Sequence, residues 1–232
     1  MPNSLKRINI GTFVLCSNLH QILIPGSVIS IGDNAFFSCR SLEKIEIPNS
    51  VTSIGISAFE FCSKLSSINI PASVNVISEK VFGGCYSLKS FTIPMSVNSI
   101  GNNAFMGSGL NVLKAANPSP IDLSQSTNVF NGIDKNNCIL IVPSGFKSAY
   151  QNANKWKEFK YIIDNEYPTE KTITVSAGKL SSQFTSLETH TLTDLTLKGT
   201  IDSRDFVFIR DSLTVLAKLD ISEVQIVSYS GA

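Results

Sequence analysis

The sequence predicts a solenoid of stacked 23-residue repeats, because several residue types recur in phase along its first half. Three columns keep this period: Cys16, Cys39, Cys62 and Cys85; Phe13, Phe36, Phe59, Phe82 and Phe105; Pro2, Pro25, Pro48, Pro71 and Pro94. An isoleucine column shares their phase: Ile8, Ile31, Ile54, Ile77 and Ile100. A fixed period of about 20–29 residues with regular Leu and Ile is typical of a leucine-rich-repeat solenoid, whose repeats bury their apolar faces by stacking.

Each repeat is expected to form one short strand of a parallel sheet and one return segment. In the unit that starts at Pro48, Leu65, Ile68 and Ile70 place their side chains inward, and Pro71 ends the strand because it has no N–H to donate. Phe59 is expected to stack with the phenyl rings of its neighbours along the solenoid axis. A recurring glycine predicts a bend with positive φ: Gly32, Gly55 and Gly101.

The repeated string IPxSVxSIGxxAFxxCxxLxxIxIP over residues 1–115 resembles the repeats of BspA-type leucine-rich-repeat proteins, many of them on the surface of Bacteroidetes. The resemblance implies a right-handed, β-rich coil with a parallel sheet on its concave side and short strands or single helical turns on its convex side. It also implies a location at the cell surface or outside the cell. The implied role is adhesion, with matrix or plasma glycoproteins such as fibronectin and fibrinogen as partners.

The regular repeats give way to a closing segment after residue 115. Ala115–Asn137 is polar and predicts an irregular coil, and Cys138–Val142 predicts a buried strand. Ser144 is expected to cap a helix with four residues on one face: Phe146, Ala149, Tyr150 and Ala153. A last strand follows at 161–163. The string CILIVPSGFKSAYQNANKWKEF resembles the closing segment of BspA-type arrays, so residues 1–164 are expected to form the array with its helical cap.

A second, shorter leucine-rich-repeat-like module of mixed α/β type is predicted for residues 171–232, after a linker at 165–170 that contains Pro168. Leu192-x-x-Leu195-x-Leu197 is echoed 24 residues later by Leu216-x-x-Leu219-x-Ile221. The other expected elements are a strand at 172–175, a helix at 178–188, and a helix from Asp202 to Arg210 with Asp205 at its third position. Both chain ends lack capping units, so we expect flanking domains of a longer polypeptide.

Composition excludes several classes of function. Lys and Arg number 19 against 18 acidic residues, without a basic cluster, so neither nucleic-acid binding nor a membrane-surface helix is expected. The apolar runs are too short to insert into a membrane, and the start MPNSLKRINIG lacks the pattern of a signal peptide. The cysteine column is interpreted as small buried residues, since the chain has no CxxC and only two histidines. No phosphate loop or catalytic triad is recognisable, and we expect no cofactor, metal site or enzymatic activity.

A binding surface remains as the candidate site. Strand alternation turns two variable columns outward on the concave sheet: Gln21, Lys44, Ser67 and Ser90; Leu23, Glu46, Asn69 and Thr92. These columns contain no Trp, Tyr or Arg, the usual anchors of tight interfaces. We expect a protein ligand here. Two alternatives stay open: a structural stalk that spaces other domains, and an accessory module of a glycan-handling surface complex.

Overall fold

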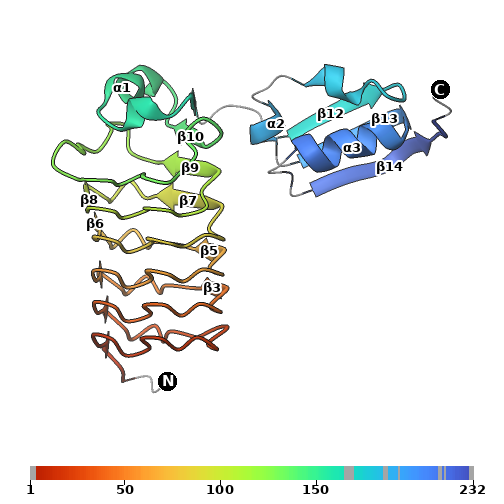
Figure 1. The fold of residues 1–232 in the computed structure, drawn as a ribbon. Coiled ribbons are helices and arrows are strands. Elements are labelled where there is room, and N and C mark those ends of the chain that lie inside the picture. The colour runs from red at the N-terminus through yellow and green to blue at the C-terminus, as the bar shows by residue number, and fades with distance from the viewer. Residues whose placement is uncertain are drawn as a thin grey trace. The chain divides into compact units, whose positions relative to one another are not determined.

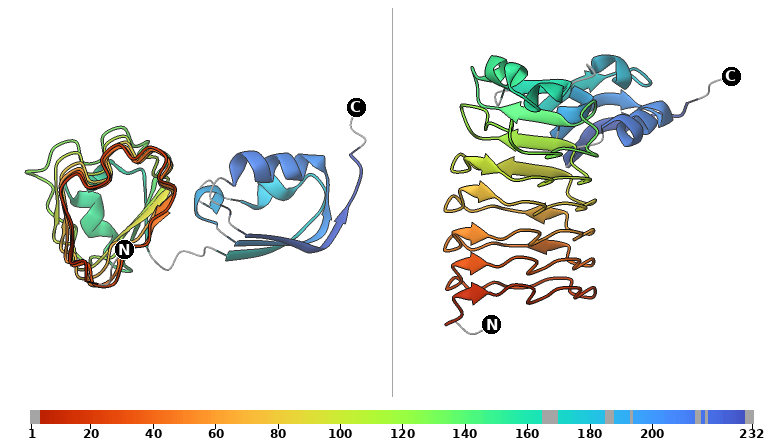
Figure 2. Two further views of the ribbon diagram at one scale, coloured as in Figure 1. Left: turned by 90° about the horizontal axis from the view of Figure 1, so that it is seen from below. Right: turned by 60° about the vertical axis from the view of Figure 1, so that its left-hand side comes forward.

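The computed structural model describes residues 4–164, 170–184, 188–192, 194–213, 216 and 218–229. The chain divides into two compact units, Met1–Asn165 and Glu166–Ala232. Unit 1 is a stack of coils closed at one end by the helix α1 (Figure 1). Unit 2 is a small sheet with helices beside it (Figures 1 and 2).

Unit 1 contains two series of short parallel strands, which we call the first and second ladders. The first ladder comprises β3 (Lys44–Ile45), β5 (Ser67–Ile68), β7 (Ser90–Ile93), β9 (Val112–Ala115), β10 (Ile139–Val142) and β11 (Tyr161–Asp164). The second comprises β1 (Arg7–Ile8), β2 (Ser30–Ile31), β4 (Ser53–Ile54), β6 (Val76–Ile77) and β8 (Ser99–Ile100), and so follows the isoleucine column. The β-rich coil that the repeat period predicts is confirmed, with strands of two to four residues.

The phenylalanine column forms a continuous stack through the core of unit 1. Centroids of successive rings lie 5.1, 5.2, 6.1 and 5.6 Å apart from Phe13 to Phe105, and the next ring, Phe130, lies 6.1 Å beyond. Phe59 is fully buried between its two neighbours, as the repeat alignment predicts. Trp156 continues the stack, with its ring centroid 5.1 Å from that of Phe130.

The cysteine column runs beside this stack as free thiols. Each buried thiol donates to the phenylalanine carbonyl of the preceding coil, with Sγ–O distances of 3.1 to 3.2 Å: Cys39 to Phe13, Cys62 to Phe36, and Cys85 to Phe59. The expectation of a buried residue is wrong for Cys16, which is exposed because no described coil stacks on its outer side. The thiol–carbonyl bonds explain why a small residue with a weak donor fits this column.

The glycine column has a different cause from the one expected. Gly32, Gly55 and Gly101 do not adopt positive φ, so that prediction is wrong. A Cβ on Gly55 would instead stand 2.5 Å from the backbone nitrogen of Asp33, which shows that the preceding coil approaches too closely for a side chain. Positive φ occurs at two other columns: Gly11, Asn34, Ser57, Lys80 and Asn103; Leu15, Ser38, Phe61, Gly84 and Gly107.

The closing segment contains no helix or strand over 116–138, in line with the predicted irregular coil. The helix α1 (Lys147–Asn152) begins later than predicted, at an N-cap formed by Phe146, and Ser144 does not cap it. Of the predicted face only Tyr150 is buried, since the helix has just six residues. The 3-10 helix η1 (Trp156–Glu158) buries Trp156 at this end of the core. The Trp156 indole donates to the Ile121 carbonyl at 2.8 Å.

Unit 2 is a parallel sheet with the order β12 (Glu170–Val175), β13 (Asp194–Ile201) and β14 (Lys218–Ile226). Lys171 pairs with Leu195, and Leu195 with Leu219, so the 24-residue echo is the strand register as far as Thr196. After a register shift between Thr196 and Lys198, β13 and β14 pair 25 residues apart. β12 includes Glu170, the last residue of the predicted linker, whereas 165–169 lie outside the described residues.

The crossovers of unit 2 match one helix prediction and contradict the other. The helix α3 (Ser203–Ser212) begins at Asp202 with Asp205 completing a reciprocal capping box, as predicted. In place of a helix over 178–188, the chain forms the 3-10 turn η2 (Leu180–Gln183) and the short helix α2 (Glu188–Thr191), while 185–187 lie outside the described residues. Gly178 has a φ of +72°, which is incompatible with a helix starting there.

Candidate functional site

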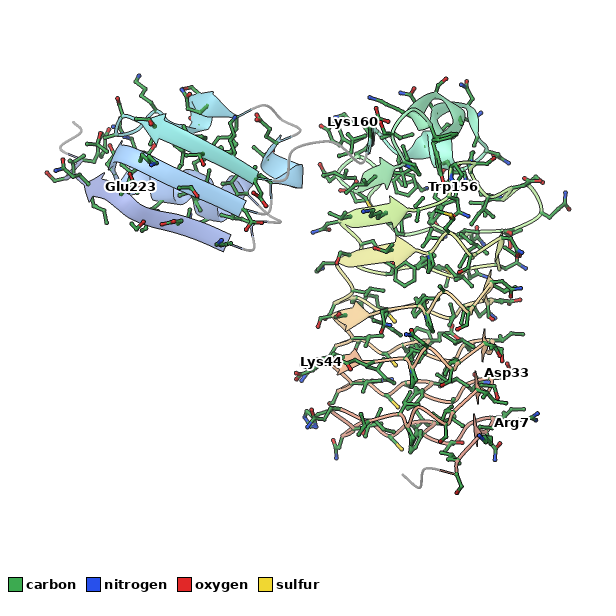
Figure 3. The ribbon with its side chains drawn as sticks, turned by 180° about the vertical axis from the view of Figure 1, so that it is seen from behind. Arg7, Asp33, Lys44, Trp156, Lys160 and Glu223 are labelled. Atoms are coloured by element: carbon green, nitrogen blue, oxygen red, sulfur yellow. The ribbon has the colours of Figure 1, made fainter. Side chains whose placement is uncertain are left out.

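All eight predicted contact residues are exposed. Four of them lie in strands of the first ladder: Lys44, Ser67, Ser90 and Thr92. Glu46 and Asn69 follow β3 and β5 directly, and Gln21 and Leu23 lie in the coil before β3. We call their surface the strand face: Gln21, Lys44, Ser67 and Ser90; Leu23, Glu46, Asn69 and Thr92. Lys44 pairs with Ser67 in register, while Ile45 and Ile68 beside them point into the core. The paired backbone and the buried alternate side chains hold the outward residues at fixed positions. Figure 3 shows Lys44 on the opposite side of the column from Arg7, which belongs to the second ladder.

Six of the eight residues border two neighbouring hollows in the first coils. The larger hollow measures about 610 Å³ and is lined in part by Leu23, Lys44, Glu46 and Asn69. The smaller, about 370 Å³, adds Gln21 to its lining. Leu23 is 81% exposed, so an apolar side chain stands at the edge of both hollows.

The remaining two predicted residues lie farther along the ladder. Ser90 and Thr92 belong to β7 and pair with Val112 and Lys114 of β9, and neither lines the two hollows. The structure therefore divides the predicted surface into an indented region over the first coils and a paired-strand region beyond it.

Asn69 has a structural partner as well as an exposed surface. Its Oδ1 accepts from the Ile47 backbone N–H at 3.3 Å, and its Nδ2 donates to the Ile47 carbonyl at 3.5 Å. The strands β3 and β5 have already ended at these positions, so the amide continues the contact between coils after backbone pairing stops. A ligand that needs both polar atoms of Asn69 would have to break these bonds.

The buried cysteines of unit 1 are weak nucleophiles. Burial raises the pKa of Cys39 to about 11 and the pKa of Cys85 and Cys138 to about 12, so these thiols stay protonated at neutral pH. Within the described residues, no cluster of three His, Cys, Asp or Glu side chains is placed to hold a metal ion. The arrangement suits non-covalent contact with a ligand surface.

Sequence analysis missed a second group of exposed residues. Phe37, Phe61 and Tyr86 lie on the turns that lead from the second ladder to the first, outside the identical columns. Their signal was available: aromatic residues at positions that vary between repeats have no role in the shared core.

Comparison with known proteins agrees with the repeat architecture. The family model described as "BspA type Leucine rich repeat region" matches residues 1–111 with six copies. Repeats of this kind indicate a protein-interaction module and are typically non-catalytic. Among curated proteins the sequence has no significant match. None of the helices in the described part of the chain combines the length and apolar character needed to cross a membrane.

Three solved structures are similar to this chain. A leucine-rich repeat protein of T. pallidum is 29% identical, with a TM-score of 0.37, over 50% of this chain and 47% of that one. A leucine-rich repeat protein from Bacteroides ovatus is 20% identical, with a TM-score of 0.42, over 92% and 72% of the two chains. A leucine rich cell surface protein from Faecalibacterium prausnitzii is 18% identical, with a TM-score of 0.31, over 98% and 84%. This chain thus spans about half the length of the T. pallidum protein.

Proposed function

Because residues 1–111 are a BspA-type leucine-rich-repeat region, we propose that the chain is a protein-binding part of a cell-surface adhesin and that the strand face is its contact surface. The partners we propose are extracellular matrix or plasma glycoproteins. The observation that carries this proposal is the meeting of six predicted residues around two hollows beside the strands β3 and β5.

The strand face supports a broad and adaptable contact rather than a tight pocket. Its inward isoleucines belong to the shared core, so outward residues can differ between repeats without disturbing the fold. Leu23 supplies an apolar contact, and Lys44 and Glu46 supply opposite charges next to it. A ligand surface with both apolar and charged groups fits this arrangement.

Affinity is expected to be modest for one chain. The strand-face columns have no aromatic or arginine anchor, so we expect a dissociation constant of about micromolar or weaker. Attachment of a cell would then depend on many copies, since linked weak sites can gain about 10²–10⁴-fold in avidity. Because the chain has a net charge of only +1, its affinity should depend only mildly on salt concentration.

The domain division is part of the proposal. We assign residues 1–164 to the array with its closing segment, 165–170 to a linker, and 171–232 to a second leucine-rich-repeat-like module. The 24-residue strand register and the helix α3 between β13 and β14 support the second assignment.

The test is titration of immobilised fibronectin and fibrinogen with multimerised chain. The double variant Lys44→Glu, Asn69→Arg should bind at least about fivefold more weakly than wild type, because it changes charge and shape at the larger hollow. The matched control Arg7→Glu, Ser99→Arg has the same change in net charge on the second ladder and should bind as wild type does.

Each remaining result points to an alternative. Equal binding by both double variants and wild type would move the contact away from the strand face. Absence of binding by multimerised wild type would favour a structural stalk that spaces other domains. Binding to polysaccharide but to neither glycoprotein would favour an accessory role in a glycan-handling complex.

A further inference from the structure

The turns between the two ladders carry the anchor residue types that the strand face lacks. We call this surface the turn strip, and its exposed or partly exposed side chains are Phe37, Arg40, Phe61, Lys64, Tyr86 and Lys89. Phe61 is 38% exposed and Tyr86 is 58% exposed. Aromatic residues and Arg are enriched where protein interfaces have their strongest contacts.

The aromatic rings of the turn strip form a stepped platform over successive coils. Phe37 and Phe61 meet edge to face, with centroids 5.6 Å apart and planes at 89°. The Phe61 ring lies on Gly84 of the next coil, since its Cδ1 is 2.5 Å from where a Cβ would stand. Tyr86 lies near Gly107, with its Cε1 at 4.0 Å from where a Cβ would stand, an ordinary van der Waals distance. Of these two glycines, only Gly84 makes room for a ring, that of Phe61, by having no side chain.

The backbone at Phe61 is unfavourable for so large a side chain. Its φ is +60°, and the whole column has positive φ: Leu15 and Ser38 precede it, and Gly84 and Gly107 follow it. The turn sets this conformation, and a bulky residue in the left-handed region costs conformational energy that glycine avoids. Phe61 is also partly exposed, so core packing alone does not account for it.

The charged side chains of the turn strip are available to a partner. Within the described residues, Arg40, Lys64 and Lys89 form no ion pair. The nitrogen Nε of Arg40 donates to Ser38, and Nζ of Lys89 donates to the Tyr86 carbonyl, so both cations have neutral partners.

Two carboxylates lie in the parts of these turns that carry the rings, residues 37–43, 60–66 and 83–89. Glu60 is buried, and Glu43 is exposed. Asp33 and the ion pair of Glu79 with Lys80 lie earlier in the turns, beside the second ladder. The solvent-facing groups are therefore three cations and one carboxylate around the aromatic platform. An acidic ligand complements this excess of positive charge.

We propose that the turn strip is a second docking surface, distinct from the strand face, and that it binds a short acidic segment of a partner protein that also carries an aromatic side chain. The rings of the platform would contact the aromatic residue, and the three cations would contact the carboxylates. Successive coils are about 4.8 Å apart, so three coils accommodate only a few residues of an extended segment. The affinity for one segment should be weak, with a dissociation constant of about 10 µM or more.

The test uses the whole chain and immobilised poly(Glu,Tyr), a random acidic copolymer, with poly(Lys,Tyr) as the basic counterpart. Wild type should bind poly(Glu,Tyr), and Phe61→Gly should weaken that binding at least about tenfold. Glycine already occupies this column in the next two coils, so the variant should fold, with a Trp156 fluorescence melt close to that of wild type. Met95→Gly is the matched control, because it removes an exposed apolar side chain at the position where another coil has Gly26.

Variants that reverse the charge of two lysines test whether the cations of the turn strip contact the carboxylates of the ligand. Lys64→Glu with Lys89→Glu should also weaken binding at least about tenfold, whereas Lys6→Glu with Arg7→Glu, on the second ladder, should not. The proposal is overturned by any of three results: no wild-type binding to poly(Glu,Tyr) up to about 1 mM, equal binding by Phe61→Gly, or equal binding of wild type to poly(Lys,Tyr). If the wild type binds dextran sulfate but not poly(Glu,Tyr), the ligand of the turn strip is an anionic polysaccharide, and the proposal of a protein partner is wrong. None of these variants touches the strand face, so the two proposals fail independently.

Discussion

Units 1 and 2 have nearly the same repeat length, 23 and 24 residues, but differ in the length of their strands and in their return segments. Unit 1 has strands of two to four residues and returns through turns with left-handed residues. Unit 2 has strands of six, eight and nine residues, and its return segments contain either the helix α3 or the 3-10 turn η2 and the short helix α2. Repeat length therefore sets which residues pair, while the return segment decides how much of each repeat is strand.

The two units also differ in what organises the core. Unit 1 depends on identical apolar residues stacked through every coil, with the phenyl rings at its centre. Unit 2 has a smaller apolar cluster of its own, and two buried carboxylates, Asp202 and Asp205, lie where α3 begins. Asp205 is 2% exposed and accepts from the backbone N–H groups of Gly178, Leu180 and Asp202 at 2.7 to 3.0 Å. A core of repeated apolar residues and a core that also contains a buried hydrogen-bonded carboxylate should respond differently to substitution.

The largest expected effect is in the phenyl stack. Phe59→Ala should lower the free energy of unfolding of unit 1 by about 3–5 kcal/mol, because it leaves a cavity between two fully buried rings. Trp156, the one tryptophan of the chain, lies in unit 1, so its fluorescence during urea unfolding reports that unit. Hydrogen exchange of α3 should not change. A melt within a degree or two of wild type would show that the repeats are misaligned.

The next effect concerns unit 2. Asp205→Asn should destabilise it by about 2–3 kcal/mol, because the amide replaces one charged acceptor oxygen with a donor that faces backbone N–H groups. Faster hydrogen exchange in β12 and α3, with an unchanged Trp156 transition, is the expected readout. Ser203→Ala, an exposed position in the same helix, is the control. If exchange is equally slow in both variants, Asp205 does not organise the unit.

A smaller effect depends on pH. Burial raises the pKa of Cys62 above its ordinary value of 9.0, so the folded state keeps a proton that the unfolded state loses as the pH rises through 9. Stability must then fall with alkaline pH. Between pH 9 and 10, wild type should lose about 1 kcal/mol more than Cys62→Ala in urea unfolding followed by Trp156 fluorescence. Parallel pH profiles of the two proteins would contradict this assignment.

The smallest effect is a labelling pattern with no change in stability. Cys16 is exposed, while Cys39, Cys62, Cys85 and Cys138 are buried as thiols. Iodoacetamide at pH 8 should add one group to native wild type and none to native Cys16→Ser, as measured by mass spectrometry, because buried thiols neither ionise nor meet the reagent. All five thiols of wild type should react in urea. Rapid modification of Cys62 in the native protein would show that the coils open.

Much of the strand face could be predicted from sequence, because alternation along a strand and a fixed repeat are both local rules. Exposure of Lys44 and Asn69 follows from the positions of Ile45, Ile68 and Ile70. The hollows and the amide bonds of Asn69 could not be predicted this way, since both depend on how neighbouring coils fit together. The turn strip shows the same limit, because Phe37 and Phe61 meet only after two coils stack.

The sequence by itself determined the repeat period, the inward columns, the 24-residue register and the capping box at Asp202 and Asp205, because each is an arrangement of residue types at fixed spacing. Only the tertiary structure decided the contacts made between coils and between crossovers. Position 55 requires glycine because Asp33 of the preceding coil lies too close for a Cβ. Cys16 is exposed because no described coil covers it. Among the described residues, the start of the helix expected at 178–188 is replaced by the 3-10 turn η2, where Asp205, 25 residues beyond Leu180, accepts from the backbone N–H groups of Gly178 and Leu180. Spacing along the chain specifies pairing, but close approach and long-range hydrogen bonds are properties of the packed molecule.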